Sequence, residues 1–293
     1  MGILGNLFKR KEDKEAKFNI LDTADTIEVG PELLDDLFSR RLDGYVHRQF
    51  LSKEECDKLV RNFYGKVGYS KDPETPVIYP PNFYQIRNEN VDEKYFQLAK
   101  DYIDEFPSTY GLDVHQRLFD LLKSVNANVN IKIPPGEENG YYQPTTFRSL
   151  PPNDVVMYAH CENQLREIFD QHCAYLSTMT DIYDSLSFFI MLKEPSEGGR
   201  LILYNVDWDR AKKNVKSHTN SVLLTTGEAI NLDDKKSPIG NLKIDMQTGD
   251  LIIFPGGQLW HSVESVAGDK NRVTFGGFLS KGRNEADTLY VWS

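Results

Sequence analysis

The pattern of hydrophobic and polar positions divides the chain into two parts. Apolar residues recur at helical spacing over 50–64, where Ser52 stands three residues before Glu55, the spacing of a capping box. Helical periodicity returns over 93–123. Because both stretches precede Ser124, the pattern predicts a mainly helical N-terminal part.

After Ser124 the pattern changes to short apolar runs separated by Gly and Pro, which is typical of strands and turns. A helical stretch over 162–182 interrupts this series. The expected strands are 125–133, 154–160, 187–193, 201–204, 222–225, 242–245, 250–254 and 272–278. Many short strands predict a mainly β fold, a sandwich or double-sheet barrel with flanking helices on one sheet.

Composition limits the class of protein. The chain has 293 residues, 40% of them hydrophobic, and a formal net charge of −10. Such a charge argues against a general binder of phosphate backbones, so we expect no nucleic-acid partner. The three cysteines, Cys56, Cys161 and Cys173, form neither a CxxC pair nor a disulfide framework, which predicts a reducing, cytoplasmic location.

No internal repeat or low-complexity tract marks a domain boundary. We expect a charged, flexible leader over 1–25 and a single domain over 26–293, with a helical part over 26–123 and a β core over 124–293. The apolar residues at the start precede the charges, the reverse of a secretory signal, and no apolar run reaches membrane-spanning length. We therefore expect no membrane partner.

Three side chains suggest a metal site. His160 and Glu162 are two residues apart, and strand side chains that are two apart project to the same face, so both could bind one metal from a strand or strand end. His261 would supply a third ligand. Two histidines and one carboxylate form a facial triad, whose open positions suit non-haem Fe(II) and oxygen chemistry.

The order of several short motifs gives a more specific signal than any one of them. They are His160-x-Glu162, then Glu197-Gly198-Gly199, then Gly249-Asp250-Leu251-Ile252-Ile253-Phe254-Pro255, then His261-x-Val263-x-x-Val266-x-x-Gly268-x-x-x-Arg272-x-Thr274. In this order, the portion from about 125 to 280 resembles the double-stranded β-helix, or jelly roll, of the Fe(II)/2-oxoglutarate-dependent oxygenases, particularly their prolyl-hydroxylase-like branch.

The resemblance implies a set of cofactors and roles. Fe(II), 2-oxoglutarate and O2 would be required, with His160, Glu162 and His261 as the catalytic metal ligands. Arg272 would bind the distal carboxylate of 2-oxoglutarate with its planar fork, and the Thr274 hydroxyl, on the same strand face, would add a donor. Tyr158, on the same strand face as His160, could contact the cosubstrate. The reaction implied is dioxygenase chemistry, in which decarboxylation of 2-oxoglutarate to succinate drives hydroxylation of an unactivated C–H bond.

The carboxylate at Glu162 bears on the outcome of that reaction. Halogenases of the family have Gly or Ala there, which makes room for chloride, so Glu162 favours hydroxylation. Glu162 also departs from the commoner aspartate, which changes ligand reach more than reaction class. The runs around His160, Ser187 and Gly198 resemble bacterial small-molecule and amino-acid oxygenases that neighbour those halogenases. They imply a free amino acid or related small metabolite as substrate.

Other residues have a functional and a plainer interpretation. His172-x-Ala174 has the form of a halogenase site, but it lies in a helical stretch, where residues two apart face different ways. Arg148 could bind a substrate carboxylate, although an Arg in a Pro-flanked segment is usually solvated. Trp260 could wall the substrate pocket, although such an aromatic is more often core. Cys161 should point away from the metal as a packed thiol.

Two other functions remain open at this point. A peptidyl, prolyl-type hydroxylase would need an open groove for an extended chain, and a cupin-like module would bind metal without oxygenase activity. The Arg272-x-Thr274 pair argues against the second, since a cupin has no general need for a cosubstrate anchor. Residues 65–92 and 134–153 could form a lid over the site. The oligomeric state is left undetermined.

Overall fold

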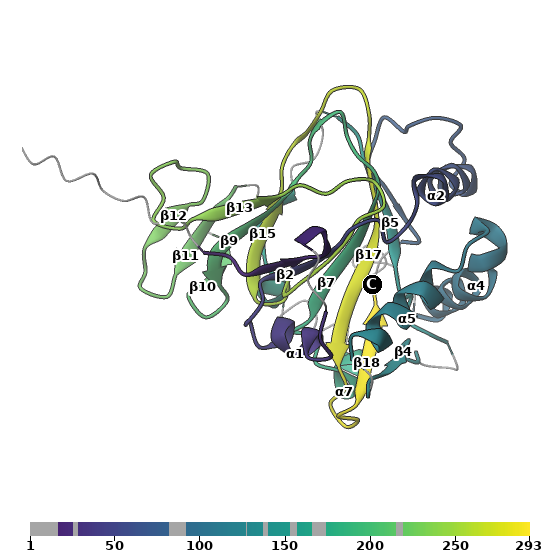
Figure 1. Ribbon diagram of the computed structural model, residues 1–293, viewed down its shortest axis with the longest axis horizontal. Helices are drawn as coiled ribbons and strands as arrows, with labels where there is room; N and C mark the ends of the chain where they lie inside the picture. The colour runs from purple at the N-terminus through teal and green to yellow at the C-terminus, as the bar shows by residue number, and fades with distance from the viewer. Residues whose placement is uncertain are drawn as a thin grey trace, which may run out of the picture.

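Two β-sheets packed face to face form the centre of the molecule in this computed structural model (Figure 1). The structure describes residues 17–25, 29–81, 92–126, 128–136, 140–152, 157–165, 174–214 and 219–293. Of the described residues, 34% are in strands and 25% in helices. The prediction of a mainly β, jelly-roll fold with flanking helices is therefore confirmed.

The larger sheet has nine strands and runs in the order β1-β2-β14-β7-β17-β18-β4, with β5 paired to both β17 and β3. The strands are β1 (Ile20–Asp22), β2 (Gly44–His47), β3 (Val77–Tyr79), β4 (Asn130–Lys132), β5 (Thr146–Leu150), β7 (Leu186–Lys193), β14 (Leu251–Phe254), β17 (Arg272–Lys281) and β18 (Thr288–Trp292). The long strand β17 pairs antiparallel with β7, β5 and β18. It therefore connects the β1-β2-β14-β7 part of the sheet to the β18–β4 and β5–β3 pairs.

The second sheet runs in the order β13-β9-β15-β6, and a separate three-stranded sheet runs in the order β10-β11-β12. Their strands are β6 (Met157–His160), β9 (Leu201–Asp207), β10 (Ala211–Asn214), β11 (Ser221–Leu224), β12 (Ala229–Asn231), β13 (Asn241–Ile244) and β15 (Leu259–Val263). A short pair, β8 (Glu197–Gly198) and β16 (Val266–Ala267), completes the strands. The β10–β12 sheet is thus an excursion of the chain between β9 and β13.

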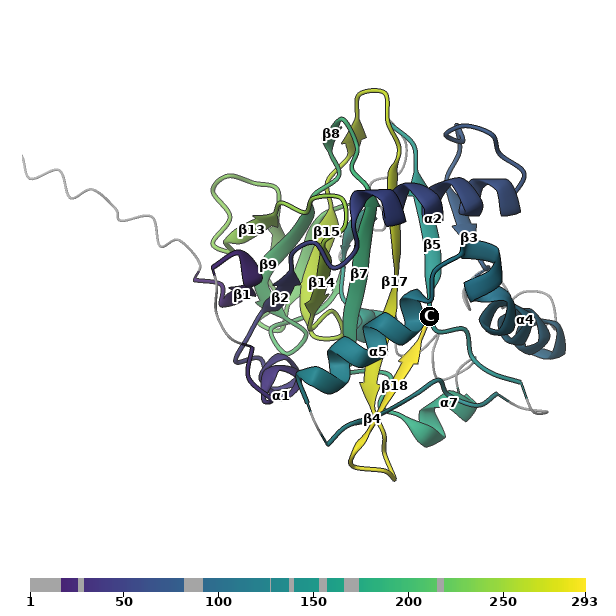
Figure 2. The same cartoon turned by 45° about the vertical axis from the view of Figure 1, so that its right-hand side comes forward.

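Helices cover the outer face of the larger sheet (Figure 2). These helices are α1 (Leu33–Phe38), α2 (Lys53–Lys66), α4 (Asp92–Tyr110) and α5 (Val114–Ser124). A further helix, α7 (Ala174–Met179), packs through Leu176 in a cluster with Tyr290 and Trp292, side chains of β18 that point away from this face. The 3-10 turns are η1 (Thr23–Asp25) and η3 (Glu162–Leu165). The predicted capping box of α2 is present, since the Glu55 amide donates to the Ser52 hydroxyl and the Ser52 amide donates to the Glu55 carboxylate. No helix in the described part of the chain is both long and apolar enough to cross a membrane.

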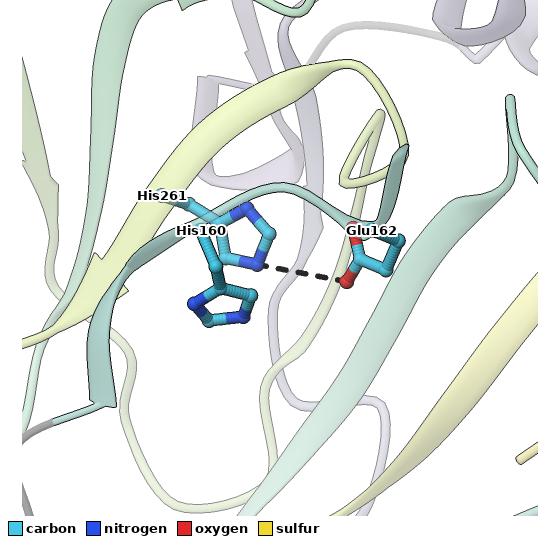
Figure 3. A group of neighbouring side chains, drawn as sticks. All are labelled: His160, Glu162 and His261. Atoms are coloured by element: carbon cyan, nitrogen blue, oxygen red, sulfur yellow. Dashed lines mark ion pairs between the residues drawn. The ribbon is translucent and has the colours of Figure 1, made fainter. Parts of the chain in front are cut away.

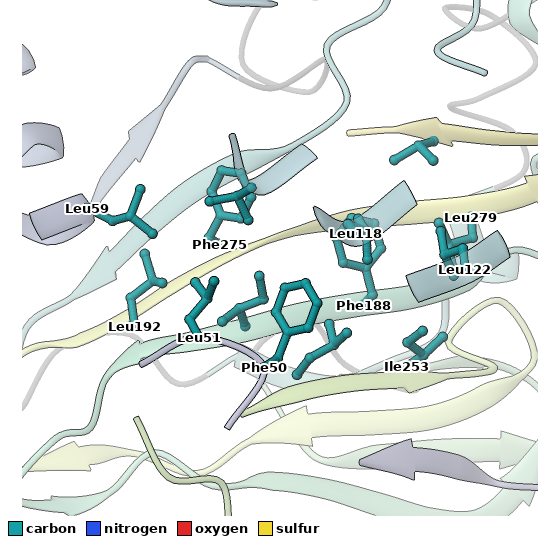
Figure 4. Packing of buried hydrophobic residues seen from close by; sticks show 14 of the residues in the cluster. Phe50, Leu51, Leu59, Leu118, Leu122, Phe188, Leu192, Ile253, Phe275 and Leu279 are labelled. Atoms are coloured by element: carbon teal, nitrogen blue, oxygen red, sulfur yellow. The ribbon is translucent and has the colours of Figure 1, made fainter. Parts of the chain in front are cut away.

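The main core lies between these helices and the larger sheet. Figure 4 shows Leu59 of α2 and Leu118 of α5 packed against side chains of the sheet, among them Leu192 and Phe275. Because strand side chains alternate, Phe275 points to the helices while Arg272 and its inward-facing neighbours point to the opposite face. The helical layer therefore fills one face of the sheet and leaves the other face for a cavity.

Several elements differ from the sequence prediction. Strand β1 lies in the expected leader, β2 and β3 lie in the part predicted as helical, and β3 and β5 lie in the segments considered as a lid. Both pair within the larger sheet, so Val77–Tyr79 and Thr146–Leu150 are sheet and not lid. Residues 82–91, 137–139 and 153 of those segments lie outside the described residues. The pattern concealed β5 because its inward positions, Thr146 and Arg148, line a cavity and are polar. Residues 1–16 of the expected leader lie outside the described residues.

Phe147 provides a test of this packing. It is completely buried, and its ring stacks on Phe63 at 4.9 Å between centroids. Replacement of Phe147 by Ala should lower the free energy of unfolding by about 3–5 kcal/mol, because it leaves a cavity in the core. Leu98→Ala, at a position 41% exposed on α4, should change it by about 0.5 kcal/mol or less. Urea denaturation would measure both, and equal losses would contradict this core assignment.

Candidate metal centre

The three predicted metal ligands lie together between the two sheets (Figure 3). His160 ends β6, His261 lies opposite it on β15, and Glu162 begins η3 two residues later. One ligand atom from each side chain lies within 4.8 Å of the others, and this is the one such group of potential metal ligands found among the described residues. His261 Nε2 is 3.7 Å from Glu162 Oε1.

Backbone carbonyls orient both imidazoles. His160 Nδ1 lies 2.7 Å from the Tyr158 carbonyl oxygen, and His261 Nδ1 lies 2.9 Å from the Leu259 carbonyl oxygen. Because a carbonyl oxygen only accepts, each Nδ1 carries the proton and donates. Each Nε2 is then an unprotonated nitrogen with a lone pair, the form in which histidine binds a metal.

One oxygen of the Glu162 carboxylate accepts a hydrogen bond, and the other is buried without a hydrogen-bond partner. Its Oε1 accepts a hydrogen bond from the Ser187 hydroxyl at 2.9 Å, while its buried Oε2 has no hydrogen-bond partner. The Glu162 amide donates to the Gly256 carbonyl at 3.1 Å. Gly256 has no room for a side chain, since a Cβ would lie 2.0 Å from Ser187 Oγ. A buried carboxylate oxygen without a partner is costly, and a bound cation would satisfy it.

Burial sets the protonation of the cluster. Desolvation lowers the pKa of His261 to about 4, and desolvation together with the neighbouring His261 lowers the pKa of His160 to about 4. Desolvation also raises the pKa of Glu162, against the opposing effects of His160 and the Ser187 hydrogen bond. Two neutral imidazoles are ready to bind a metal, and the buried carboxylate lacks a compensating positive charge. The donor set therefore fits a divalent cation.

A cavity of about 230 Å³ adjoins the three ligands. Arg272, Thr274 and Arg148 line it together with apolar walls that include Phe189. The Arg272 Nε donates to the Gly199 carbonyl at 2.8 Å, and its guanidinium lies 5.0 Å from the centre of the Phe189 ring. Burial, with the charge of Arg148, lowers the pKa of Arg272 to about 9, so the guanidinium remains charged at neutral pH. Such a group fits a carboxylate.

Arg148 approaches the cavity from the neighbouring strand. It pairs with Thr274 across the β5–β17 ladder, which puts the two side chains on the same face. Its Nη1 lies 3.3 Å from the sulfur of Met157, and its charge acts on His160, Glu162 and Arg272. The cavity thus contains a second guanidinium, that of the half-buried Arg148, close to the three potential metal ligands.

Two predicted contacts are wrong. Trp260 is completely buried in another core cluster, where its indole Nε1 donates to the Ala211 carbonyl at 3.0 Å, so it does not line the substrate cavity. Side chains alternate along β15, so His261 faces the cavity and its neighbour Trp260 faces the opposite side. The Tyr158 side chain is 37% exposed and lies outside the cavity wall, so only its backbone carbonyl serves the site. Cys161 is buried beside Trp260, pointing away from the cluster as expected.

The remaining histidines do not join the site in the described part of the chain. His115 is buried and hydrogen-bonds Thr145 Oγ1 at 2.7 Å, and His47 hydrogen-bonds the Tyr45 hydroxyl. His172, of the rival His172-x-Ala174 motif, lies outside the described residues, as do Cys173 and His218. Sequence reasoning missed Ser187 and Gly256. The Pro-Gly-Gly turn after β14 was a signal for a close backbone approach, whereas nothing distinguished Ser187 from other strand residues.

Comparison with known families agrees with this geometry. The family model of the carrier-protein-independent halogenase WelO5 matches residues 17–293. The chain belongs to the WelO5 family. It is accordingly a non-haem iron enzyme, a dioxygenase that uses Fe(II), 2-oxoglutarate and O2. No curated protein matches the sequence of this WelO5-family member significantly.

Solved structures show the fold of the WelO5-family chain. It is similar to an N-substituted L-amino acid dioxygenase from Burkholderia ambifaria AMMD, with 13% identity and a TM-score of 0.52 over 90% of this chain and 91% of that chain. The same dioxygenase in complex with alpha-KG gives a TM-score of 0.50, with 13% identity over the same shares of the two chains. At this identity the likeness supports the fold alone.

The low pKa values of the histidines predict an acid-sensitive metal-free protein. Between about pH 6.5 and 4 the unfolded chain takes up protons that the half-buried His160 and the buried His261 do not, so stability falls as the pH falls through this window. Each histidine should contribute up to about 3 kcal/mol to the loss. Urea denaturation of the metal-free protein at pH 7 and pH 4 would measure it. The double variant His160→Gln/His261→Gln should lose less stability than the wild type, and an equal loss would contradict the prediction.

Proposed function

We propose that the protein hydroxylates an unactivated C–H bond of a free amino acid or a related small metabolite. The reaction would be coupled to decarboxylation of 2-oxoglutarate to succinate and CO2. The observation that carries the proposal is the carboxylate of Glu162, held beside two neutral histidines with a buried oxygen that lacks a partner.

The proposed metal ligands are His160 Nε2, His261 Nε2 and the carboxylate of Glu162. When bound there, Fe(II) would supply the activation of oxygen, and two histidines with one carboxylate leave three coordination positions open for cosubstrate and oxygen. The chain's own contribution is to fix the three ligands. The Tyr158 and Leu259 carbonyls fix the imidazoles, and the Ser187 hydroxyl fixes one carboxylate oxygen.

Arg272 and Thr274 are the proposed anchor of 2-oxoglutarate. The buried guanidinium offers a planar pair of N–H donors to the distal carboxylate, and the hydroxyl of Thr274 can add a third donor. Because both side chains are excluded from water, the charge-assisted bonds are strong. The contact of Arg272 with the Gly199 carbonyl and the Phe189 ring holds the guanidinium in one place before the cosubstrate arrives.

The carboxylate of Glu162 favours hydroxylation, although the family model that matches the chain is named after a halogenase. A halogenase of this class lacks a carboxylate at the position of Glu162 and admits a halide there. In this chain the Glu162 side chain fills that position, and Ser187 and Gly256 close around it, with Gly256 too tightly packed to accept even a Cβ. The space that a halide would need is therefore occupied.

Arg148 is the proposed contact for a carboxylate of the substrate. It lines the same cavity as Arg272 but comes from another strand, so one guanidinium can bind the cosubstrate and the other the substrate. A cavity of about 230 Å³ favours small substrates, being below the range usual for drug-sized ligands. The N-substituted L-amino acid dioxygenase of similar fold is, by its description, an enzyme of amino-acid-like molecules, the substrate class that we propose.

A screen for products tests the proposal directly. The protein would be incubated with Fe(II), 2-oxoglutarate, O2 and panels of free amino acids, N-substituted amino acids and peptides, and mass spectrometry would detect products that gain one oxygen. We expect such products with amino-acid-like molecules, together with succinate. Turnover with peptides alone would instead establish the peptidyl hydroxylase, and chlorinated products from the wild-type enzyme would contradict hydroxylation.

The two arginines should have separable effects. Arg272→Lys should weaken binding of 2-oxoglutarate by about 10–100-fold, because Lys cannot reproduce the bidentate fork. Arg148→Lys should raise the KM for the organic substrate by a similar factor and change the affinity for 2-oxoglutarate by less than about three-fold. Titration calorimetry and steady-state kinetics would measure these quantities. An equal loss of 2-oxoglutarate affinity in both variants would contradict the division of roles.

Substitutions of Glu162 test its role as a ligand. Glu162→Ala should lower Fe(II) affinity and hydroxylation by more than about ten-fold in chloride-free buffer, whereas Glu162→Asp, which keeps the carboxylate, should retain a larger share of both. In chloride, Glu162→Ala should recover part of its iron affinity. Anaerobic Fe(II) titration in the two buffers gives the comparison, and unchanged hydroxylation by Glu162→Ala would rule out Glu162 as a ligand.

A further inference from the structure

The β10–β12 sheet lies against the strands that carry both histidines, on the face opposite the cavity. Residues of β6 and β15, among them Ala159 and Trp260, share one hydrophobic cluster with residues of the β10–β12 sheet such as Ala211, Val222 and Ile230. Strand alternation explains the arrangement, because the neighbours of His160 and His261 point away from the metal ligands. The β10–β12 sheet therefore supports the site from behind.

A hydrogen bond from the backbone of β6 to Asn220 holds the edge of this strand. This strand is the last in the order β13-β9-β15-β6, so its outer edge has no strand neighbour in that sheet. The Ala159 amide donates to Asn220 Oδ1 at 2.7 Å, in the place where a further strand would accept. Ala159 lies between Tyr158, whose carbonyl binds the His160 ring, and His160 itself. The bond therefore acts on the backbone that aims His160.

Asp233 fixes the orientation of the Asn220 amide. Asn220 Nδ2 lies 3.1 Å from Oδ1 and 3.0 Å from Oδ2 of Asp233. A carboxylate only accepts, so it binds the NH2 group and turns the carbonyl oxygen of Asn220 toward Ala159. Asp233, in the loop after β12, therefore orients the Asn220 side chain, and Asn220 in turn binds the backbone of β6.

A second bond reaches the other histidine. Trp260 Nε1 donates to the Ala211 carbonyl of β10 at 3.0 Å, and Trp260 directly precedes His261. The ladders of β15 shift register on both sides of His261, toward β6 and toward β9. Because regular ladder bonds are interrupted there, bonds from outside the ladder become more important for the position of His261.

We propose that the β10–β12 sheet positions the metal ligands, with Asn220 and Asp233 as positioning residues for His160. The proposal rests on the proposed function, in which His160 and His261 bind iron. The pair sets where the His160 ring stands relative to His261, whose ring centroid is 4.3 Å away. Loss of the pair frees the edge of β6, spreads the positions of His160 Nε2 and weakens the metal site without removing a ligand.

Exchange of the two side chains gives a sharp test. Asn220→Asp places two carboxylates against each other. The hydrogen bonds between residues 220 and 233 should therefore be lost, and Fe(II) affinity should fall by about ten-fold. The double variant Asn220→Asp/Asp233→Asn restores one acceptor and one donor. An Asp at 220 can accept from the Ala159 amide while the new amide at 233 donates to it. We expect Fe(II) affinity within about two-fold of the wild type.

The readouts separate positioning from general stability. Anaerobic Fe(II) titration gives the affinity, the charge-transfer absorption of the Fe(II)–2-oxoglutarate complex reports ligand geometry, and thermal melting reports the fold. The matched control is Asp234→Ala, which removes a carboxylate whose Oδ1 accepts from the Lys236 amide in the same loop. This control should leave affinity and absorption unchanged. If Asn220→Asp fails to fold, Asn220→Ala, which removes the acceptor without adding charge, takes its place.

The outcomes distinguish this proposal from the proposed function. Wild-type iron affinity and absorption in Asn220→Asp, together with loss of iron binding in His160→Ala, would overturn the positioning role alone. Retained iron binding in His160→Ala would overturn the proposed function itself. A double variant that regains the melting temperature but not the iron affinity would also overturn positioning, because the effect of the pair would then be on stability only.

Discussion

The antiparallel pairing of β6 with β15 is the constraint on which the site depends. It sets His160 opposite His261, and because strand side chains alternate it also sends their neighbours, Ala159 and Trp260, into a core on the other face. A shift of one residue in this register would exchange the two faces, burying the histidines in the core and placing Trp260 in the cavity. The hydrophobic cluster behind the strands therefore selects the register that assembles the metal ligands.

Charge gives the cavity its chemical preference. A carboxylate, Glu162, and two arginines, Arg148 and Arg272, line one cavity, with two imidazoles that desolvation keeps neutral. Alone, these groups carry excess positive charge at one end and an unsatisfied carboxylate at the other. In the proposed complex, divalent iron, the 2-oxoglutarate dianion and a substrate carboxylate would cancel these formal charges. Burial of charged groups is unfavourable unless each has a partner of opposite charge, and the bound ion and molecules of the proposed complex would supply these partners.

Stability and function are assigned to opposite faces of the same strands. On β17, Phe275 packs among aromatic side chains under the helical layer, while Arg272 and Thr274 face the cavity. The N-terminal helices therefore provide the apolar surface that lets the larger sheet keep polar residues on its inner face. The β10–β12 sheet does the same for β6 and β15. Each layer covers one side of a strand whose other side serves the site.

The sequence by itself determined the family resemblance, the mainly β fold and the capped helix at Ser52, and it singled out the three potential metal ligands that the structure brings together, because these depend on local periodicity and short spacings. It did not determine that β5 is a strand of the larger sheet, since its polar inward positions look irregular until the cavity is known. Only the tertiary structure decided that Trp260 is core, that Ser187 holds Glu162, and that Asn220 reaches Ala159. Those contacts join residues far apart in the chain, and strand pairing and layer packing, which leave no local pattern, bring them together.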